Sequence, residues 1–345
     1  MASGDMNNIL ENDVAMSSRV RLARNFRDYP FPYKMDLKQS EAILNKVKDA
    51  VFGGNASMIK DFAFYDIQNT SLIDRQILVE KHLISKELAE SKRPGGALIN
   101  KDGNISIMVN EEDHLRIQGL FPGIQLEKAW DVCNKIDNLL EEKIDFAFDD
   151  KFGFLTCCPT NTGTAIRASV MLHLPALVIT GYLKGVLEAC GKVGITVRGL
   201  YGENTEALGN MFQVSNQVTL GQSEEEIIAN VKNIALQIIE QEKRLRSDLY
   251  KQNTLLFEDK IYRSLGILLS ARVISSEESH KLLSDVRLGI DMGIIKDIDL
   301  DVVSEIMILI RPANLQAALG KSLNQIERDV GRADLIRNKL SKAKE

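Results

Sequence analysis

"CCPTNTGTAIRASVMLHLP", residues 157–175, is the stretch that best indicates how the chain folds and what it handles. Two cysteines precede a turn rich in threonine, and Arg167 lies in the apolar run that follows. A glycine-bearing turn of this kind beside a cation indicates anion binding. The stretch is not the phosphate loop G-x-x-x-x-G-K-[ST], because it has no lysine and its glycine spacing differs. If phosphate is bound here, we expect arginines to do what a lysine and loop amides do elsewhere.

The whole chain has the size and composition of a globular protein with two domains. It has 345 residues, of which 44% are hydrophobic and 26% are charged. The net charge of -5 argues against general nucleic-acid binding, although a local basic cleft stays open. No apolar run approaches the roughly 20 residues that span a bilayer, and the first residues do not resemble a secretory signal. The four cysteines form no C-x-x-C pair, so we expect no zinc site, no disulfide framework and a cytoplasmic location.

Hydrophobic spacing predicts a mixed α/β part followed by a helical part. Ser223 and Glu226 form a capping box, and after them almost every segment has helical periodicity. We therefore predict one domain over 1–248 and a helical domain over 249–345. In the first domain the patterns predict helices over 36–51 (with Asp36 as N-cap), 73–89, 126–144 and 176–191, hairpins over 97–109 and 144–158, and strands over 194–200 and 212–220.

Three further stretches have a chemical logic if they converge with the first. They are "SSRVRLARN" (17–25), "VNEEDHLRI" (109–117) and "RGLYGENTEALGNMF" (198–212). Arg19 and Arg21 are two apart, so on a strand they share a face. Guanidinium groups suit phosphate oxygens, and phosphoryl transfer needs positioning and charge neutralisation above all. Taken one at a time, however, such arginines, carboxylates and cysteines are more often surface or packing residues.

Taken together, these motifs resemble those of the phosphagen (guanidino) kinases in order and spacing. The chain is similar to the bacterial branch, the McsB-type protein arginine kinases, over nearly all of residues 10–345. The resemblance implies an α+β fold, with a largely antiparallel, glutamine-synthetase-like sheet flanked by helices and followed by a helical domain. It implies transfer of the ATP γ-phosphoryl group to arginine side chains of proteins, which marks them for Clp-type degradation and controls stress regulators. The implied cofactors are ATP and Mg²⁺, the metal being held through phosphate and water with no protein ligand named.

The resemblance also implies roles for single residues. Glu112 matches the catalytic carboxylate, Glu203 the second carboxylate facing the guanidinium, and Cys158 the cysteine beside the substrate. His82 matches a histidine near the nucleotide base. The arginines that match phosphate ligands are Arg19, Arg21, Arg116, Arg167 and Arg198. The resemblance also implies three nucleotide-binding segments, which contain all of these arginines except Arg116. They are made of Ser18, Arg19, Val20, Arg21 and Leu22; of Arg167, Ala168, Ser169, Val170 and Met171; and of Arg198, Gly199, Leu200, Tyr201, Gly202 and Glu203.

Two carboxylates make chemical sense for this acceptor. An arginine side chain has a pKa of ~12.5–13.8, so removing its proton at pH 7 costs on the order of 8 kcal/mol. A carboxylate pair can orient the planar guanidinium and accept that proton as the N–P bond forms. We assign Cys158 a positioning or tuning role, and it is a candidate oxidation-sensitive switch.

The chain departs from the family pattern at three places. Thr162 and Ala165 stand where the family has Leu and Gly, in the turn that positions Cys158. Gln213 replaces an aspartate that contacts nucleotide in creatine kinase, so that contact is not carried over. The first motif begins by residue 17, so we expect the N-terminal helical domain of the classical enzymes to be absent and the site to be open to arginine on a protein.

The helical part contains "RDVGRA", which matches the R-D-x-x-R-A motif of the bacterial branch. Arg328 and Arg332 are four apart and share a helix face, so they could grip a phosphate, with Asp329 on the attached guanidinium and Ala333 completing the motif. The resemblance thus implies an allosteric phosphoarginine site. A solvated basic helix is the ordinary alternative.

The resemblance implies partners too. These are arginine-bearing protein substrates, an activating adaptor of McsA type, a repressor of CtsR type, a Clp unfoldase and a second copy of the chain, with neither nucleic acid nor membrane bound directly. Two other functions stay open at this point. One is a small-molecule kinase acting on free arginine; the other is a non-catalytic phosphoarginine-binding adaptor, against which the retained Glu112, Glu203 and arginines argue.

Overall fold

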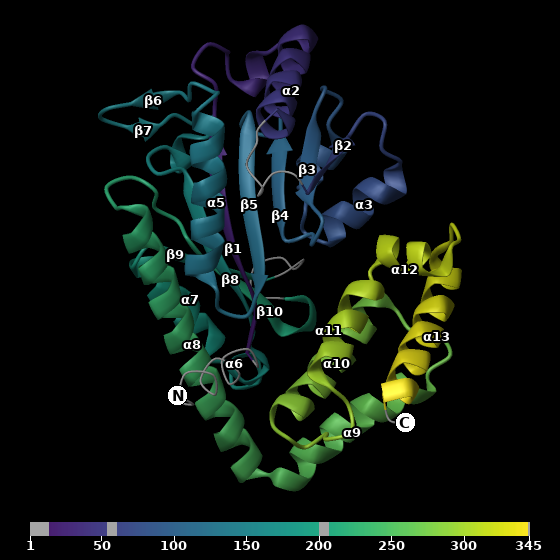
Figure 1. The fold of residues 1–345 in the computed structure, drawn as a ribbon. Coiled ribbons are helices and arrows are strands. Elements are labelled where there is room, and N and C mark those ends of the chain that lie inside the picture. Colours follow the sequence, from purple (N-terminus) through teal and green to yellow (C-terminus); the bar gives the residue numbers. More distant parts are fainter. Residues whose placement is uncertain (1–13, 54–60, 200–206, 344–345) are drawn as a thin grey trace, which may run out of the picture.

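The computed structural model describes residues 14–53, 61–199 and 207–343. A twisted sheet lies at the centre, with helices packed on it and a helical part beside it (Figure 1). Within these ranges the sheet has eight strands in the order β2-β3-β4-β5-β1-β8-β10-β9, and each neighbouring pair is antiparallel. The predicted α+β class, with a largely antiparallel sheet followed by helices, is confirmed. The strands are β1 (Ala15–Arg24), β2 (Phe62–Asp66), β3 (Gly96–Asn100), β4 (Ile105–Val109), β5 (Leu115–Pro122), β8 (Ile166–His173), β9 (Ile195–Gly199) and β10 (Met211–Asn216).

The strand register gives the sheet two different faces. Arg21 on β1 lies opposite Arg167 on β8 and Gln118 on β5, and directly opposed residues point to the same face. We call this the arginine face. The alternate residues, such as Val20 and Leu22, are fully buried on the other side, which we call the core face.

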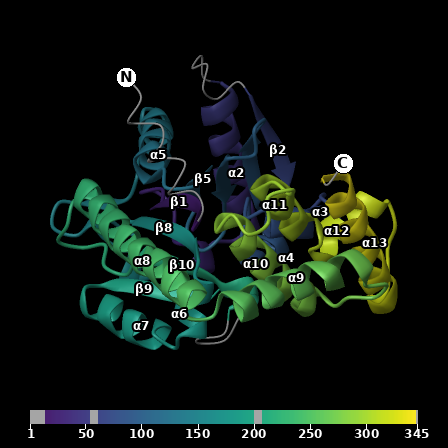
Figure 2. The same ribbon diagram turned by 90° about the horizontal axis from the view of Figure 1, so that it is seen from below.

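Four helices cover the core face. They are α2 (Leu37–Phe52), α5 (Leu126–Glu141), α7 (Leu183–Lys192) and α8 (Glu224–Gln252), and they bury the largest hydrophobic cluster of the described residues against the sheet. Figure 2 shows α8 lying along β8 and β10. The predicted cap at Asp36 is confirmed, because its carboxylate accepts from Gln39 N at 2.7 Å and Gln39 returns the bond. The predicted capping box of Ser223 and Glu226 is confirmed in the same way.

Two of the predicted helices were wrong in extent, because each is interrupted by a left-handed residue. The segment 73–89 forms α3 (Leu72–Glu80) and α4 (Lys86–Glu90), separated by a turn in which His82 has φ 59°. The segment 176–191 forms α6 (Pro175–Ile179) and α7, with Gly181 at φ 74° between them. The two predicted hairpins are confirmed as β3–β4 and as the short pair β6 (Phe148–Asp149) and β7 (Gly153–Phe154).

Among the described residues, the arginine face is covered at its two ends. Helices α3 and α4 cover it at the β2–β4 end, over a small apolar cluster that includes Leu78, Leu88 and Met108. At the other end Met171 and Met211 pack against the core of the helical part. That part consists of α9 (Thr254–Ser270), α10 (Ser276–Asp291), α11 (Leu300–Leu309), α12 (Pro312–Leu319) and α13 (Gln325–Ala343). The arginines therefore lie between two covered ends of one sheet face.

No single helix among the described residues is long and apolar enough to cross a membrane. The bent pair of α11 and α12, which meet at 94°, passes that test by length and composition only.

Candidate active site

The register gathers the five predicted arginines on one face. Arg19 and Arg21 come from β1, Arg116 from β5, Arg167 from β8 and Arg198 from β9. Arg21 opposes Arg167, and the partners Arg198–Gln213 and Gln213–Met171 extend the same face to the sheet edge. Strands far apart in sequence thus bring five cations together.

Arg21 is the most confined of these cations. Its pKa is lowered well below the usual value, first by burial and then by the charges of Arg19, Arg116 and Arg167. Its Nε is buried and has no hydrogen-bond partner among the described residues. A buried cation among like charges is costly unless an anion meets it. The arginine face therefore fits a polyanion such as a triphosphate.

The predicted base, Glu112, lies at the edge of this face in the loop between β4 and β5. Its Oε2 is 3.5 Å from Arg116 Nη2, and its side chain is 42% exposed. Burial raises the pKa of Glu112, Arg116 opposes that rise, and Asp113 and Glu111 add to it. A carboxylate with a raised pKa, open to the cavity, suits proton transfer.

The adjacent Glu111 is a site residue that the sequence patterns did not single out. It is only 3% exposed, and its Oε1 accepts from Arg116 Nη1 at 2.8 Å. Its other oxygen is buried without a partner among the described residues. Its place in "VNEEDHLRI", one residue before Glu112, was the only available signal.

The cysteine turn is tied to the Glu112 loop through Asp113. Asp113 Oδ1 accepts from Cys157 N at 2.7 Å and from Asn25 Nδ2 at 2.7 Å. Cys158 Sγ lies 3.0 Å from Thr160 Oγ1. Arg167 Nη2 donates to Asn161 Oδ1 at 3.3 Å, which joins the cysteine turn to the arginine face. Burial and the nearby carboxylates raise the pKa of Cys157, which keeps that thiol protonated.

The two residues of this turn that differ from the family pattern are Thr162 and Ala165. Thr162 Oγ1 is 3.0 Å from Thr156 Oγ1, which donates to Cys158 O at 2.7 Å. Ala165 has φ 52°, the left-handed region that favours glycine. Gly163 is required, because a Cβ there would lie 2.2 Å from Thr219 O.

His82 lies at the far end of the arginine face. Burial lowers its pKa to about 3, with help from the charges of Arg311 and Arg19. Gln118 Nε2 donates to His82 O at 2.7 Å, which fixes the turn to β5. At the same end Arg19 Nη2 donates to Gln213 Oε1 at 2.9 Å, so the substituted Gln213 holds an arginine.

Not every residue of the predicted nucleotide segments has its side chain at the site. Val20, Leu22, Ala168 and Val170 are fully buried in the core, so only their backbone can face a nucleotide. Ser18 Oγ is also turned away, since it donates to Gly123 O at 2.7 Å. Ser169 and Met171 lie on the arginine face, and Gly199 ends β9. Leu200, Tyr201, Gly202 and Glu203 lie outside the described residues.

A cavity of about 910 Å³ joins Glu112 to Arg21 and Arg116. Glu111 also lines it. The rest of the lining includes the basic pair Lys92 and Arg93 and the apolar Met35 and Leu37. The cavity is large enough for a nucleotide phosphate chain and an arginine side chain together.

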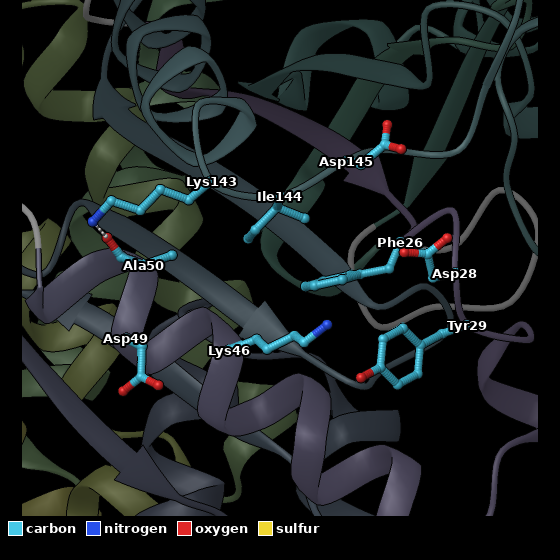
Figure 3. Close-up of a pocket in the computed structure, with 9 residues that line it drawn as sticks. All are labelled: Phe26, Asp28, Tyr29, Lys46, Asp49, Ala50, Lys143, Ile144 and Asp145. Atoms are coloured by element: carbon cyan, nitrogen blue, oxygen red, sulfur yellow. Dashed lines mark hydrogen bonds between the residues drawn. The ribbon is translucent and has the colours of Figure 1, made fainter.

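A second cavity, of about 430 Å³, lies between α2, the end of β1 and the segment after α5 (Figure 3). It is lined by side chains of both signs, and Lys143 Nζ donates to Ala50 O at 3.2 Å. It contains none of the predicted site residues.

Comparison with known proteins agrees with this geometry. The family model "ATP:guanido phosphotransferase, C-terminal catalytic domain" matches residues 42–245. The chain belongs to the ATP:guanido phosphotransferase, or phosphagen kinase, family. A second model, "Protein-arginine kinase McsB C-terminal domain", matches residues 254–345.

Individual members of the phosphagen kinase family match over most of the chain. A protein-arginine kinase of Caldanaerobacter subterraneus subsp. tengcongensis is 51% identical over 96% of this chain and 98% of that relative. The protein-arginine kinase of Bacillus subtilis is 46% identical over 96% and 91%. Among solved structures, a Schistosoma mansoni taurocyamine kinase with bound transition-state-analogue components has a TM-score of 0.60 at 28% identity, over 67% of this chain and 33% of that one. A lombricine kinase has a TM-score of 0.61 at 20% identity, over 69% and 68%, and shows the shared fold.

The R-D-x-x-R-A stretch lies on α13. Arg332 is only 2% exposed, and its Nε and Nη1 donate to Ile310 O at 3.1 Å and to Ile274 O at 2.9 Å. Asp329 pairs with Arg332 at 2.5 Å, and Arg328 Nη1 donates to Leu323 O at 2.9 Å. Ala333 is buried beside them. In this arrangement Arg332 supports the helical part, and Arg328 is the more open of the two cations.

Proposed function

We propose that this chain is an ATP-dependent protein arginine kinase whose arginine face holds the triphosphate while Glu112 takes the proton of the incoming guanidinium. The observation that carries the proposal is the meeting of Arg21, Arg116 and Glu112 in one cavity. Relatives that are about half identical over nearly their whole length are protein-arginine kinases, which favours arginine on a protein over free arginine as acceptor.

The reaction follows from these groups. Glu112 accepts a proton from a guanidinium nitrogen, and that nitrogen attacks the γ-phosphorus. The N–P bond forms, the bond between the γ-phosphorus and the β–γ bridging oxygen breaks, and ADP leaves. Arg21, Arg116 and Arg167 offset the negative charge that spreads over the phosphoryl oxygens. Glu203 is proposed as the second carboxylate on the guanidinium, and Cys158 as a residue that positions it.

Mg²⁺ fits this site as a companion of the phosphates. When bound, the metal would offset charge on the phosphate oxygens. The described residues contain no group of three or more metal-ligating side chains. Glu111 Oε2 and Asp113 Oδ2 are buried oxygens without a partner among the described residues, and they suit waters of a hydrated Mg²⁺.

The wider setting is also part of the proposal. We place the chain in the cytoplasm as a homodimer, with an adaptor of McsA type, a repressor of CtsR type and a Clp unfoldase as partners. The division at about residue 248 would separate catalysis from a regulatory helical domain. There Arg328, Asp329 and Arg332 would bind phosphoarginine after Arg332 is released from its carbonyl partners. Equal binding of free phosphoarginine by wild type and Arg332→Ala would contradict the proposed phosphoarginine site.

The test is to incubate the full chain with Mg-ATP and either an unfolded protein or free arginine. We expect phosphate on protein arginines that is lost on acid treatment and is absent with Glu112→Ala. Phosphate on free arginine alone would support the small-molecule kinase, and no phosphorylation with either acceptor would support the binding adaptor. Phosphorylation by Glu112→Ala at the wild-type rate would overturn the assignment of the base.

A further inference from the structure

Besides the contact at Met171 and Met211, the helical part meets the sheet domain near the arginine face where α12 packs on the end of α3. Glu80, the last residue of α3, places its carboxylate on the first turn of α12. Its Oε1 accepts from Ala313 N at 2.8 Å, and its Oε2 accepts from Asn314 N at 2.8 Å and Asn314 Nδ2 at 2.7 Å. The N-cap residue of α12, Arg311, makes no side-chain cap of its own. A residue far away in the sequence therefore caps this helix.

Arg311 in turn contacts the end of α3. Its Nη1 donates to the backbone carbonyl of Glu80 and lies 3.3 Å from His82 Nε2. An arginine can only donate, so His82 Nε2 must be the acceptor and the ring must be neutral with its proton on Nδ1. The guanidinium of the helical part thus fixes both the tautomer and the direction of the ring.

The backbone at His82 shows that the ring is held in place against local preference. His82 N donates to Val79 O at 2.9 Å and Leu83 N donates to Leu78 O at 2.9 Å, which are the two bonds of a Schellman motif. His82 is then the C′ residue, with φ 59°, where glycine is the usual choice. A strained non-glycine residue at such a position is a reason to look for function.

A residue of α13 holds the backbone next to Arg311. Arg332 Nε donates to Ile310 O at 3.1 Å, the carbonyl that directly precedes Arg311. Arg332 is buried, and its Nη1 also bonds Ile274 O and Asp329. The position of Arg311 is thus set by the packing of the helical part and not by its own chain alone.

We propose that Glu80 and Arg311 form an interdomain clasp that positions His82 for the nucleotide, so that the helical part completes the ATP site. This inference rests on the proposed function and on the family resemblance, which implies that His82 lies near the base of ATP. Glu80 and Arg311 are positioning residues in it, because they act through His82. The clasp gives the helical part a direct means of setting nucleotide affinity.

The test compares Arg311→Met, Glu80→Gln and His82→Gly in the full chain, with Arg263→Met as a matched control. Arg263 is an arginine of α9 whose side chain is 74% exposed. Its Nε lies 4.0 Å from Asp259 Oδ2, which makes a weak ion pair at the surface. Kinetics of protein phosphorylation would give kcat and the KM for Mg-ATP, and calorimetry would give the Kd for Mg-ADP. We expect Arg311→Met and Glu80→Gln to raise KM and Kd about tenfold while kcat stays within about threefold, and Arg263→Met to change neither.

A double variant separates positioning from general packing. If the clasp acts through His82, Arg311→Met adds little to the KM of His82→Gly, whereas independent effects would multiply. Multiplied effects, or a wild-type KM and Kd in both Arg311→Met and Glu80→Gln, would overturn the clasp. An inactive wild type would instead overturn the proposed function. Thermal unfolding without nucleotide shows whether each variant is folded, and Arg311→Lys, which keeps one donor, should give an intermediate KM.

Discussion

Glu112, the proposed base, lies among charges that shift its pKa. Burial raises its pKa, and the carboxylates of Asp113 and Glu111 add to that rise against Arg116. The base must be ionised to accept a proton, so kcat/KM should increase with pH through a pKa above the usual ~4.3 of a glutamate and stay high beyond it.

Asp113→Asn provides the check on this profile. The asparagine Oδ1 can still accept from Cys157 N and Asn25 Nδ2, but one negative charge is gone. The pKa of Glu112 should fall, so the acid limb of kcat/KM should move to lower pH. Rates of protein phosphorylation between about pH 4.5 and 8 would show this. An acid limb that is unchanged in Asp113→Asn would contradict the assignment of Glu112.

Ala165 illustrates strain at the level of one residue. Its φ of 52° costs an alanine more than a glycine, so Ala165→Gly should stabilise the fold by about 0.5–1 kcal/mol after the entropy of glycine in the unfolded chain is counted. Denaturant unfolding measures the change. Ala168→Gly, at a buried position within β8, is the control and should destabilise. Equal losses in both variants would show that φ at Ala165 is not the deciding term.

At the scale of elements, a buried ion network joins α6, α8 and α10. Glu242 on α8 is fully buried and accepts from Ala176 N and Leu177 N, both at 2.9 Å, at the start of α6. Arg246 pairs with Glu242 at 2.8 Å and with Asp291 of α10 at 3.2 Å. The network satisfies a helix N-terminus and at the same time ties the helical part to α8.

Glu242→Gln should therefore destabilise the fold by about 3 kcal/mol, because it leaves Arg246 with one carboxylate fewer in a buried setting. Glu240→Gln, on the exposed side of the same helix, should change stability by less than about 0.5 kcal/mol. Chemical denaturation of both variants gives the comparison. Equal stabilities would mean that the network contributes only geometry.

Element boundaries were predictable where local chemistry decides them. Asp36 and Ser223 start their helices as expected, because capping depends on a few neighbouring side chains. The break at His82 was not predictable, because nothing in the local sequence favours a left-handed histidine over a continuous helix. Contacts with β5 and with Arg311 hold it there.

The candidate site was predictable in part for the same reason. The motifs located Arg21, Arg167 and Glu112, and strand periodicity placed Arg19 with Arg21. That these cations share one face depends on pairing between distant strands, which local patterns do not encode. The contact between Arg311 and Glu80 could not be predicted from local patterns at all, since it joins residues 231 positions apart.

For the molecule as a whole, histidine burial should govern the response of stability to acid. The chain has four histidines, and burial lowers the pKa of each: His82 to about 3, His114 to about 4, His173 well below its usual value, and His280 below it. In the unfolded chain they titrate near 6.5. The folded-state pKa is depressed, so their contribution to stability is complete above about pH 6.5 and is lost as pH falls toward the folded values.

His114 allows this contribution to be isolated. Its Nδ1 accepts from Phe26 N at 2.9 Å, so Nε2 carries the proton and donates to Pro30 O at 3.0 Å. The ring is therefore neutral in the fold, and between about pH 6.5 and 4 it should add a slope of about 1.4 kcal/mol per pH unit to the free energy of unfolding. Asp113 and Asp137, whose pKa values burial raises, add slopes of the opposite sign, so the difference between two chains is the quantity to measure. His114→Asn can keep the bond to Phe26 N without titrating, so it should be less stable at pH 7 but lose less stability on acidification. Urea unfolding of both chains at half-unit steps from pH 7 to 4 gives the two slopes, and parallel slopes would mean that His114 is protonated in the folded protein.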